Sequence, residues 1–266
     1  MYQEERLLKI LDYISENHAM SVMDICSLLD VSRDTARRDI VKLVQEGVVI
    51  RTHGGVALPQ LKKEIATYQE RLIDETDSKN KIGKIAAKLV QDRETVIFDV
   101  STTVQSVAEQ ISAKNITVVT HSIDIVGILS GREDLQVYVL GGYLHTKNRL
   151  LYGPSVIDKL RELRADKAFI GATSIQTDGL YFPYEDDVSV KKEMARRSDQ
   201  VIVVADFTKF TSKSVYRLDF DLVDILITDQ EVPNEIREVL HNKNIAIIQC
   251  EEKDKDKYEE DNKDES

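Results

Sequence analysis

The sequence predicts an α/β protein in which a small helical domain with a β-hairpin precedes a larger domain built on a mostly parallel sheet. Three observations lead to this prediction. Residues 4–46 carry apolar residues at helical spacing. Paired glycines at 54–55 lie between two short β-prone runs. From residue 79 onward, short apolar runs alternate with segments of helix length, as in a parallel sheet covered on both faces.

The length of 266 residues fits two domains. We expect the first over residues 1–58 and the second over 79–250. Between them, periodicity weakens around Pro59, so 59–78 are expected to be a linker with room for a short helix. Residues 251–266 hold nine acids and four lysines and have almost no apolar residues, so we expect an acidic disordered tail.

Composition excludes several classes of protein. Hydrophobic residues make up 42% and charged residues 31%, as in an ordinary globular protein. No apolar run approaches 18 residues, so we expect no membrane span. The acidic start lacks the features of a secretory signal, and we expect a cytoplasmic protein. Cys26 and Cys250 lie in apolar surroundings and are expected to be buried thiols rather than a disulfide, metal ligands or a nucleophile.

Three helices and a hairpin are expected in the first domain. The first covers residues 4–16. The second begins after Ser21, which forms a capping box with Asp24. The third begins after Ser32 and ends near Glu46. Residues 48–56 then form the hairpin wing, so the order of elements is that of a winged helix-turn-helix.

Seven strands are expected in the second domain, most of them separated by helix-length segments. This alternation predicts a Rossmann-like, mostly parallel sheet. The expected strands are Thr95–Phe98, Ile116–Val119, Val137–Leu140, Ala168–Ile170, Val201–Val204, Ile225–Ile227 and Ile245–Ile248.

The third helix has a basic outer face. Its Arg and Lys residues occur in pairs four residues apart and point away from its apolar stripe. An α-helix fits the major groove, where Arg pairs with guanine or phosphate. The alternative is a solvated charged face. The net charge of −11 would argue against nucleic acid as a binding partner only if the charge were spread evenly over the protein surface. The DNA-binding candidates are Ser32, Arg33, Thr35, Arg37, Arg38 and Lys42 on the helix, with Arg51 and His53 on the wing.

Residues 3–58 closely resemble the DeoR-type winged helix-turn-helix. The match runs through residues 31–40, Leu43 and Gly47 to the Arg-Thr-His-Gly-Gly of 51–55, with Ala36 in place of the usual Ile. The resemblance continues to about residue 230. It implies a repressor of a sugar-catabolism operon that binds double-stranded operator DNA and is released by a phosphorylated sugar. It also implies a second domain similar to sugar-phosphate isomerases.

Residues 99–103 end one expected strand and open a helix. Free amides and hydroxyls at such a helix start attract an anion such as phosphate. The alternative, equally supported by these residues, is an ordinary Ser/Thr helix cap. The family usually has Asp-Ser-Gly-Thr-Thr here, so Ser101 stands where Gly is common. If that position required a positive φ, a serine would be strained and the loop would have another shape.

Two further strand ends resemble family motifs. Thr120-His121-Ser122 resembles Thr-Asn-Ser, and His121 could change ligand choice or make affinity depend on pH. Gly141-Gly142 matches Gly-Gly, where a ligand can approach the backbone; the alternative is an ordinary tight turn.

Late in the chain, Asp187, Lys191, Asp206 and Lys209 match the acids and lysines of family motifs. Either lysine could offset ligand charge, and each could equally sit in a structural ion pair. The effector-binding candidates are Asp99, Ser101, Thr102, Thr103, Thr120, His121, Ser122, Gly141, Gly142, Lys191 and Lys209.

Three functions remain open. The first is a ligand-controlled repressor, expected to be a homo-oligomer (dimer or tetramer) because one winged helix contacts few base pairs. The second is a sugar-phosphate isomerase-like enzyme carrying a helix-turn-helix; no carboxylate pair has a clear acid-base task, and the sequence leaves Asp99 and Asp187 open for one. The third is a protein-interaction module. We expect no cofactor, no catalytic residues and no metal site, since His18, His145 and His241 lack metal-ligand spacing.

Overall fold

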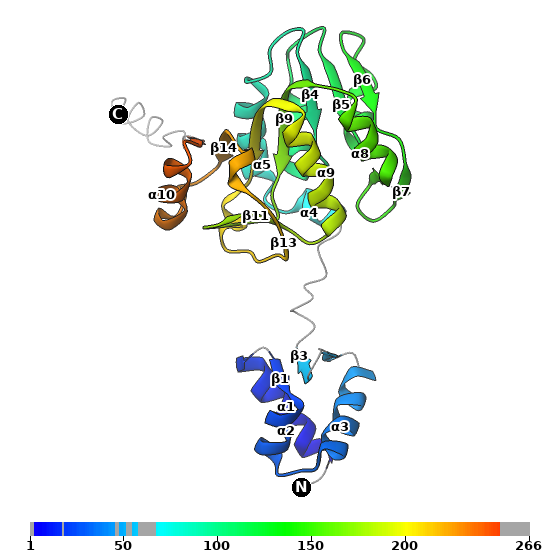
Figure 1. Cartoon of the computed structure of the whole chain (residues 1–266), viewed down its shortest axis with the longest axis vertical. Helices are drawn as coiled ribbons and strands as arrows, with labels where there is room; N and C mark the ends of the chain where they lie inside the picture. Colours follow the sequence, from blue (N-terminus) through cyan, green and yellow to red (C-terminus); the bar gives the residue numbers. More distant parts are fainter. Residues whose placement is uncertain (1–2, 18, 46–47, 52–54, 58–67, 251–266) are drawn as a thin grey trace, which may run out of the picture. The chain divides into compact units, whose positions relative to one another are not determined.

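The computed structural model describes residues 3–17, 19–45, 48–51, 55–57 and 68–250 (Figure 1). The chain divides into two compact units, Met1–Ala66 and Thr67–Ser266. The expected acidic tail at 251–266 lies outside the described residues. In the described part of the chain, no helix is long and apolar enough to cross a membrane.

The described residues of the first unit form three helices and a small antiparallel sheet of strand order β1-β3-β2. The capping box is present, because the Ser21 hydroxyl accepts from the Asp24 amide at 3.1 Å and the Asp24 carboxylate accepts from the Ser21 amide at 3.0 Å. The expected winged helix-turn-helix is confirmed. Its elements are α1 (Gln3–Asn17), β1 (Ala19–Ser21), α2 (Val22–Leu29), α3 (Arg33–Gln45), β2 (Ile50–Arg51) and β3 (Gly55–Ala57).

Strand β1 was not expected from the sequence, and it explains one glycine. Met20 pairs with Val56 across the sheet. A Cβ atom on Gly55 would lie 2.0 Å from the carbonyl oxygen of Met20. A glycine is therefore required at position 55 by the close approach of β1.

The second unit is built on a seven-stranded parallel sheet of order β15-β14-β12-β9-β4-β5-β6. All seven strands coincide with the expected ones to within a few residues. They are β4 (Thr95–Phe98), β5 (Thr117–Thr120), β6 (Gln136–Val139), β9 (Ala165–Gly171), β12 (Ser198–Val204), β14 (Ile225–Thr228) and β15 (Ala246–Gln249).

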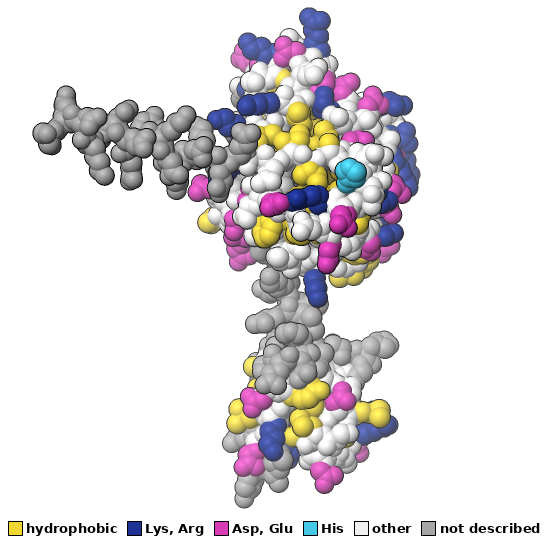
Figure 2. Space-filling model, turned by 90° about the vertical axis from the view of Figure 1, so that its left-hand side faces the viewer, with side chains coloured by type: hydrophobic (Ala, Val, Ile, Leu, Met, Phe, Trp, Pro, Cys, Tyr) yellow, Lys and Arg dark blue, Asp and Glu magenta, His cyan; other side chains and the backbone are white. Residues whose placement is uncertain are grey.

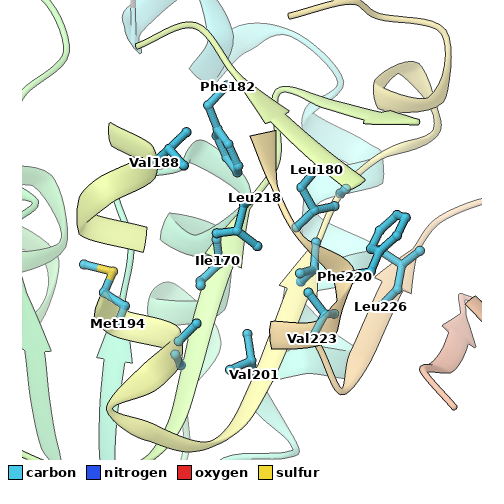
Figure 3. Close-up of a cluster of buried hydrophobic side chains, with 14 of the residues drawn as sticks. Ile170, Leu180, Phe182, Val188, Met194, Val201, Leu218, Phe220, Val223 and Leu226 are labelled. Atoms are coloured by element: carbon cyan, nitrogen blue, oxygen red, sulfur yellow. The ribbon is translucent and has the colours of Figure 1, made fainter. Parts of the chain in front are cut away.

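Helices cover both faces of this sheet. Phe98 packs with residues of α5, α6 and α7, whereas its neighbour Ile97 packs with residues of α8, α9 and α10. Figure 3 shows part of the second cluster, where Ile170 and Met194 lie among other buried apolar side chains. The helices are α5 (Thr76–Ala87), α6 (Thr102–Gln110), α7 (Ile123–Leu129), α8 (Pro154–Arg161), α9 (Glu185–Arg196) and α10 (Asn234–Asn242).

The strand order creates a switch point between β4 and β9. From β4 the chain adds β5 and β6 on one side, and it then returns to place β9 on the other side of β4. Ligands of open α/β sheets bind beside the carboxyl ends of the strands at such a point. Asp99 directly follows β4, and Gly171 ends β9.

Several short elements were not expected. The second unit begins before residue 79, because α4 (Tyr68–Ile73) and the start of α5 occupy the end of the expected linker. The other additions are a hairpin of β7 (Tyr143–His145) and β8 (Leu150–Tyr152), a small sheet of β10 (Ser174–Gln176), β11 (Gly179–Phe182) and β13 (Tyr216–Leu218), and two 3-10 turns, Phe207–Phe210 and Phe220–Leu222.

Candidate functional site

Helix α3 presents its basic residues as expected. Its inner stripe is at most 2% exposed, and the side chains of Arg33, Arg37 and Arg38 are exposed. Lys42 is half-buried. At the start of the helix, the Ser32 hydroxyl accepts from the Thr35 amide at 3.3 Å. Acidic and basic side chains are interspersed on the side of each unit that Figure 2 shows.

Asp39 has a role that sequence reasoning missed. It is 0% exposed and accepts from Arg6 Nε at 2.6 Å and from Gln3 Nε2 at 3.0 Å. These contacts tie α1 to α3. The only acid between Arg38 and the end of α3 therefore faces inward, where it does not offset the basic outer face.

The wing supplies one described candidate. Arg51 is exposed on β2, which pairs with β3. His53 lies outside the described residues.

In the second unit, Asp99 lies at the switch point and links three elements. It is 0% exposed. One oxygen lies 2.5 Å from Nζ of Lys191 on α9, and the other accepts from the Gly171 amide at 3.1 Å. Asp99 therefore joins the ends of β4 and β9 to α9.

Lys191 is fully engaged by carboxylates. Besides Asp99, it contacts Asp187 at 3.0 Å, and its ammonium lies 5.1 Å from the centre of the Phe182 ring. Burial alone would lower the pKa of Lys191, but Asp187 and Asp99 together raise it, so the side chain stays charged. The ion-pair interpretation of Lys191 is the one observed.

Ser101 is the N-cap of α6. Its φ is −144° and its ψ is 142°, an extended conformation that needs no glycine. Its hydroxyl accepts from the amides of Thr103 at 3.2 Å and Val104 at 3.4 Å. A Cβ on Gly171 would lie 2.2 Å from this hydroxyl, so the glycine of β9 makes room for the serine.

Thr102 and Thr103 differ from Ser101 in their hydrogen bonding. Both are buried in the first turn of α6, at 5% and 4% exposure. Their hydroxyls have no partner among the side chains and backbone that the structure describes. The helix cap thus uses the serine and leaves two hydroxyls for another acceptor or donor.

The motif Thr120-His121-Ser122 at the end of β5 also contains both hydrogen-bonded and unpaired side-chain groups within the described residues. The Thr120 hydroxyl donates to the Phe98 carbonyl at 2.8 Å, and the Ser122 hydroxyl caps α7 by accepting from the Ile125 amide at 3.3 Å. His121 lies between them at 2% exposure. Within the described residues, its Nδ1 atom has no hydrogen-bond partner.

Burial lowers the pKa of His121 to about 4, with Asp99 opposing and Lys191 adding to that effect. The imidazole is therefore neutral near pH 7. A pKa this low argues against a pH-dependent affinity near pH 7, and the influence of His121 on ligand affinity and on ligand choice remains a prediction.

The two glycines after β6 have different surroundings. A Cβ on Gly142 would lie 2.3 Å from the carbonyl oxygen of Tyr152, so the close approach of β8 requires a glycine at this position. Gly141 has open space around it, and its carbonyl accepts from the Ser155 hydroxyl at 3.0 Å.

Lys209 is also paired. Its Nζ lies 3.2 Å from Asp206, which is buried, and 2.9 Å from the Thr208 hydroxyl. The contacting oxygen, Oδ2 of Asp206, makes an ion pair but no hydrogen bond within the described residues.

A shallow apolar depression lies elsewhere, at the amino ends of β4 and β5, where Thr95, Thr117 and Tyr138 contribute to its lining. Its lysine, Lys159, is paired with Glu162 at 2.6 Å. None of the expected site residues lines it. Among the described residues, no group of three His, Cys, Asp or Glu side chains could hold a metal.

Comparison with known protein families assigns both units. Residues 6–61 match the DeoR-like helix-turn-helix domain, and residues 74–230 match the DeoR C terminal sensor domain. The chain belongs to the DeoR family. It is therefore a DNA-binding transcriptional regulator with a sensor domain, and its fold is a winged helix-turn-helix followed by a Rossmann-like domain.

Relatives in this family cover nearly the whole chain. The HTH-type transcriptional repressor GlcR of Bacillus subtilis (strain 168) is 45% identical over 236 residues, which are 88% of this chain and 91% of that protein. The glycerol-3-phosphate regulon repressor of Escherichia coli (strain K12) is 26% identical over 254 residues, 94% of this chain and all of that protein.

Among solved structures, ribose 5-phosphate isomerase A of Methanocaldococcus jannaschii matches with a TM-score of 0.37 at 16% identity. The match covers 52% of this chain and 55% of the isomerase.

Proposed function

We propose that this chain represses a sugar-catabolism operon and is released from DNA by a small phosphorylated sugar. Helix α3 would enter the major groove of the DNA, where Arg33, Arg37 and Arg38 would make contacts. Arg51 of the wing would contact the DNA backbone or an adjacent groove. The sugar phosphate would bind at the carboxyl ends of β4, β5 and β9.

The observation that carries this proposal is the unpartnered Nδ1 of His121. A buried polar atom without a hydrogen bond costs free energy, and proteins retain such atoms mainly where a ligand or an ordered water completes them. His121 interacts electrostatically with Asp99 and Lys191, so it belongs to the cluster at the switch point. The first turn of α6 adds amide dipoles that favour an anion beside that cluster.

Each candidate has a proposed part in ligand binding. Thr102 and Thr103 would donate to phosphate oxygens at the start of α6. Asp99 would accept from a sugar hydroxyl, because an ionised carboxylate can accept more hydrogen bonds than the two groups it now binds. Ser122 would contact a second sugar hydroxyl, and Lys209 would offset ligand charge.

The same cluster argues against catalysis. A general base needs a carboxylate able to take a proton from the substrate. Asp99 and Asp187 both contact the ammonium of Lys191, which favours their charged forms, although burial raises the pKa of Asp187. We therefore propose that the second unit binds a sugar phosphate without converting it. Formation of an isomer on incubation with pentose or hexose phosphates would contradict this.

We also propose that the protein binds its operator as a dimer or tetramer. One winged helix reads only a few base pairs, and specific binding usually uses two half-sites. Sedimentation of the protein alone and on its operator tests this. A monomer in both states would refute it.

Calorimetry tests the ligand proposal directly. The protein would be titrated with ribose 5-phosphate and glucose 6-phosphate, and with ribose and glucose as controls. We expect binding of at least one ester and no binding of the matching free sugar at the same concentration. Equal affinity for a free sugar and its ester would show that no phosphate site exists at α6.

A further inference from the structure

Strand β6 forms one edge of the seven-stranded sheet (Figure 1). Its inner side pairs with β5, where the amides of Gln136 and Leu140 donate to carbonyl oxygens at 2.9 and 2.8 Å. Since backbone amides alternate sides along a strand, those of Val137 and Val139 point away from β5. No second strand pairs with β6 among the described residues, so its outer side can accept a strand from another chain.

This edge lacks the charges that usually protect an edge strand. Exposed edges in soluble proteins commonly carry lysine, other charged residues or proline. Residues 135–144 contain none of these, although charged residues make up 31% of the chain. Charges beside the edge are paired with each other, because Asp134 contacts Arg132 and Lys159 contacts Glu162, each at 2.6 Å. The edge is therefore electrically neutral along its length.

Exposed apolar side chains concentrate beside the same edge. Ten large hydrophobic side chains are exposed in the described part of the second unit, and half of them lie between residues 138 and 152 on β6, β7 and β8. These five are Tyr138, Val139, Tyr143, Leu144 and Tyr152. A four-residue strand can exchange only about four hydrogen bonds with another strand. Apolar side chains that flank the strand would therefore supply most of the free energy of an interface here.

The neutral charge of the edge fits a second copy of this chain. A twofold contact places a surface against itself, so a charged edge would repel its own copy and a neutral edge does not. Two β6 strands related by a twofold axis are necessarily antiparallel, and antiparallel strands pair well. Binding to two operator half-sites also needs at least two copies of the chain.

The other edge of the sheet, β15, is less suited to such a contact. It is followed after Cys250 by residues 251–266, which hold nine acids and four lysines. Pairing of two β15 strands would bring two acidic segments to adjacent strand ends, where like charges oppose association. None of the ten exposed hydrophobic side chains lies on β15. The charge distribution therefore favours β6 as the edge that associates.

We propose that two copies of this chain associate through β6, which pairs antiparallel with β6 of the second copy about a twofold axis. Tyr138 and Val139 would pack across the axis, and Tyr143 and Tyr152 would extend the apolar contact beyond the strand. This inference rests on the proposed function, in that it supplies the surface for the proposed dimer or for one of the contacts of a tetramer.

Sedimentation equilibrium of the full-length protein tests the surface. The variant is Val139→Asp, which places two like charges near each other across the axis. The matched control is Val215→Asp, because Val215 is exposed on a different part of the second unit. We expect Val139→Asp to weaken association about 100-fold or more and to halve the mass at a concentration where the parent is fully associated. The control should keep the mass of the parent.

Cysteine cross-linking gives a second measurement that needs no loss of stability. Tyr138 lies inside a four-residue strand and hence near the axis, so Tyr138→Cys should form a disulfide-linked dimer on mild oxidation. Val215→Cys and the parent are the controls and should not. If Val139→Asp does not fold, as judged by circular dichroism, the absence of this link overturns the inference.

The outcomes separate this inference from the proposed function. An unchanged mass in a folded Val139→Asp overturns the β6 contact, while repression and effector binding stand. A parent that is monomeric alone and on its operator overturns both the contact and the proposed oligomer. Effector binding is measured separately by calorimetry, so its failure is distinguishable from failure of the β6 contact.

Discussion

Two buried aspartates, Asp39 in the first unit and Asp99 in the second, are each held by a basic residue distant in the sequence. Both oxygens of Asp39 are satisfied by Arg6 and Gln3. Both oxygens of Asp99 also have partners, Lys191 and the Gly171 amide. What differs is the surroundings, because Asp99 interacts electrostatically with His121, whose Nδ1 has no hydrogen-bond partner within the described residues.

This difference distinguishes a structural ion pair from the proposed binding site. The Asp39 pair fixes α1 against α3, and the exposed basic residues of α3 point away from it. The Asp99 cluster retains hydrogen-bonding capacity in a buried place, where an unmade hydrogen bond is costly. A buried ion pair by itself is therefore no sign of function. A buried polar group that lacks a hydrogen-bond partner and lies close to such a pair is one.

Removing the cation of the Asp99 cluster should have the largest effect on stability. Lys191→Met leaves two carboxylates close together without a positive partner, and breaking a buried pair in this way costs about 3–5 kcal/mol. Urea unfolding of the parent and the variant measures the loss. Lys192→Met on the same helix is the control, since its side chain is more exposed. Equal losses for the two variants would contradict the importance of the buried pair.

The next effect is a dependence of stability on pH that resides in His121. Its pKa is about 4 in the folded protein and about 6.5 when unfolded. Above pH 6.5 both states are neutral at this residue. As pH falls from 6.5 to 4, the unfolded state binds the proton first, so folding loses up to about 3 kcal/mol.

Asparagine does not titrate, so His121→Asn should lose less stability across this window than the parent does. Urea unfolding from pH 7.5 to 4.5 measures the difference. His241→Asn on the exposed side of α10 is the control and should behave like the parent. A parallel pH profile for His121→Asn and the parent would show that the histidine is not buried in its neutral form.

On the DNA-binding side, we expect smaller effects that leave the fold intact. Arg37→Ala and Arg38→Ala should each weaken operator binding, by about 1–3 kcal/mol where the arginine contacts a base. A phosphate-contacting arginine should instead weaken binding to all sequences and flatten the salt dependence. Lys9→Ala, on the exposed side of α1, is the control. Unchanged operator affinity in both arginine variants would eliminate α3 as the recognition helix.

The regular elements could be predicted because their signals are local. Each of the seven strands is an apolar run between helical segments, and Ser21 and Ser32 mark helix starts by their own hydrogen bonds. Helix α4 has only six residues and one buried side chain, Tyr68, so its pattern is too short to distinguish from a linker.

The site could be predicted only in part, because its contacts span long stretches of sequence. Asp99 and the threonines of α6 follow from the position of a strand end. The pairing of Asp99 with Lys191 spans 92 residues, and that of Arg6 with Asp39 spans 33. Gly171 matters only because Ser101 lies against it, which no local pattern reveals.

Release of operator DNA by a sugar phosphate tests the central claim most directly. Genomic fragments retained by the protein supply a labelled operator, and fluorescence anisotropy follows its release as ribose 5-phosphate or glucose 6-phosphate is added. A ligand releases DNA only if it favours the state that binds DNA poorly. We expect one of these esters, but not its free sugar, to release the parent. Thr102→Val should bind the operator normally and need roughly tenfold more of that ester, since it loses one hydrogen bond to a charged group. Release by the free sugar, or an unchanged response of Thr102→Val, would contradict the proposed site.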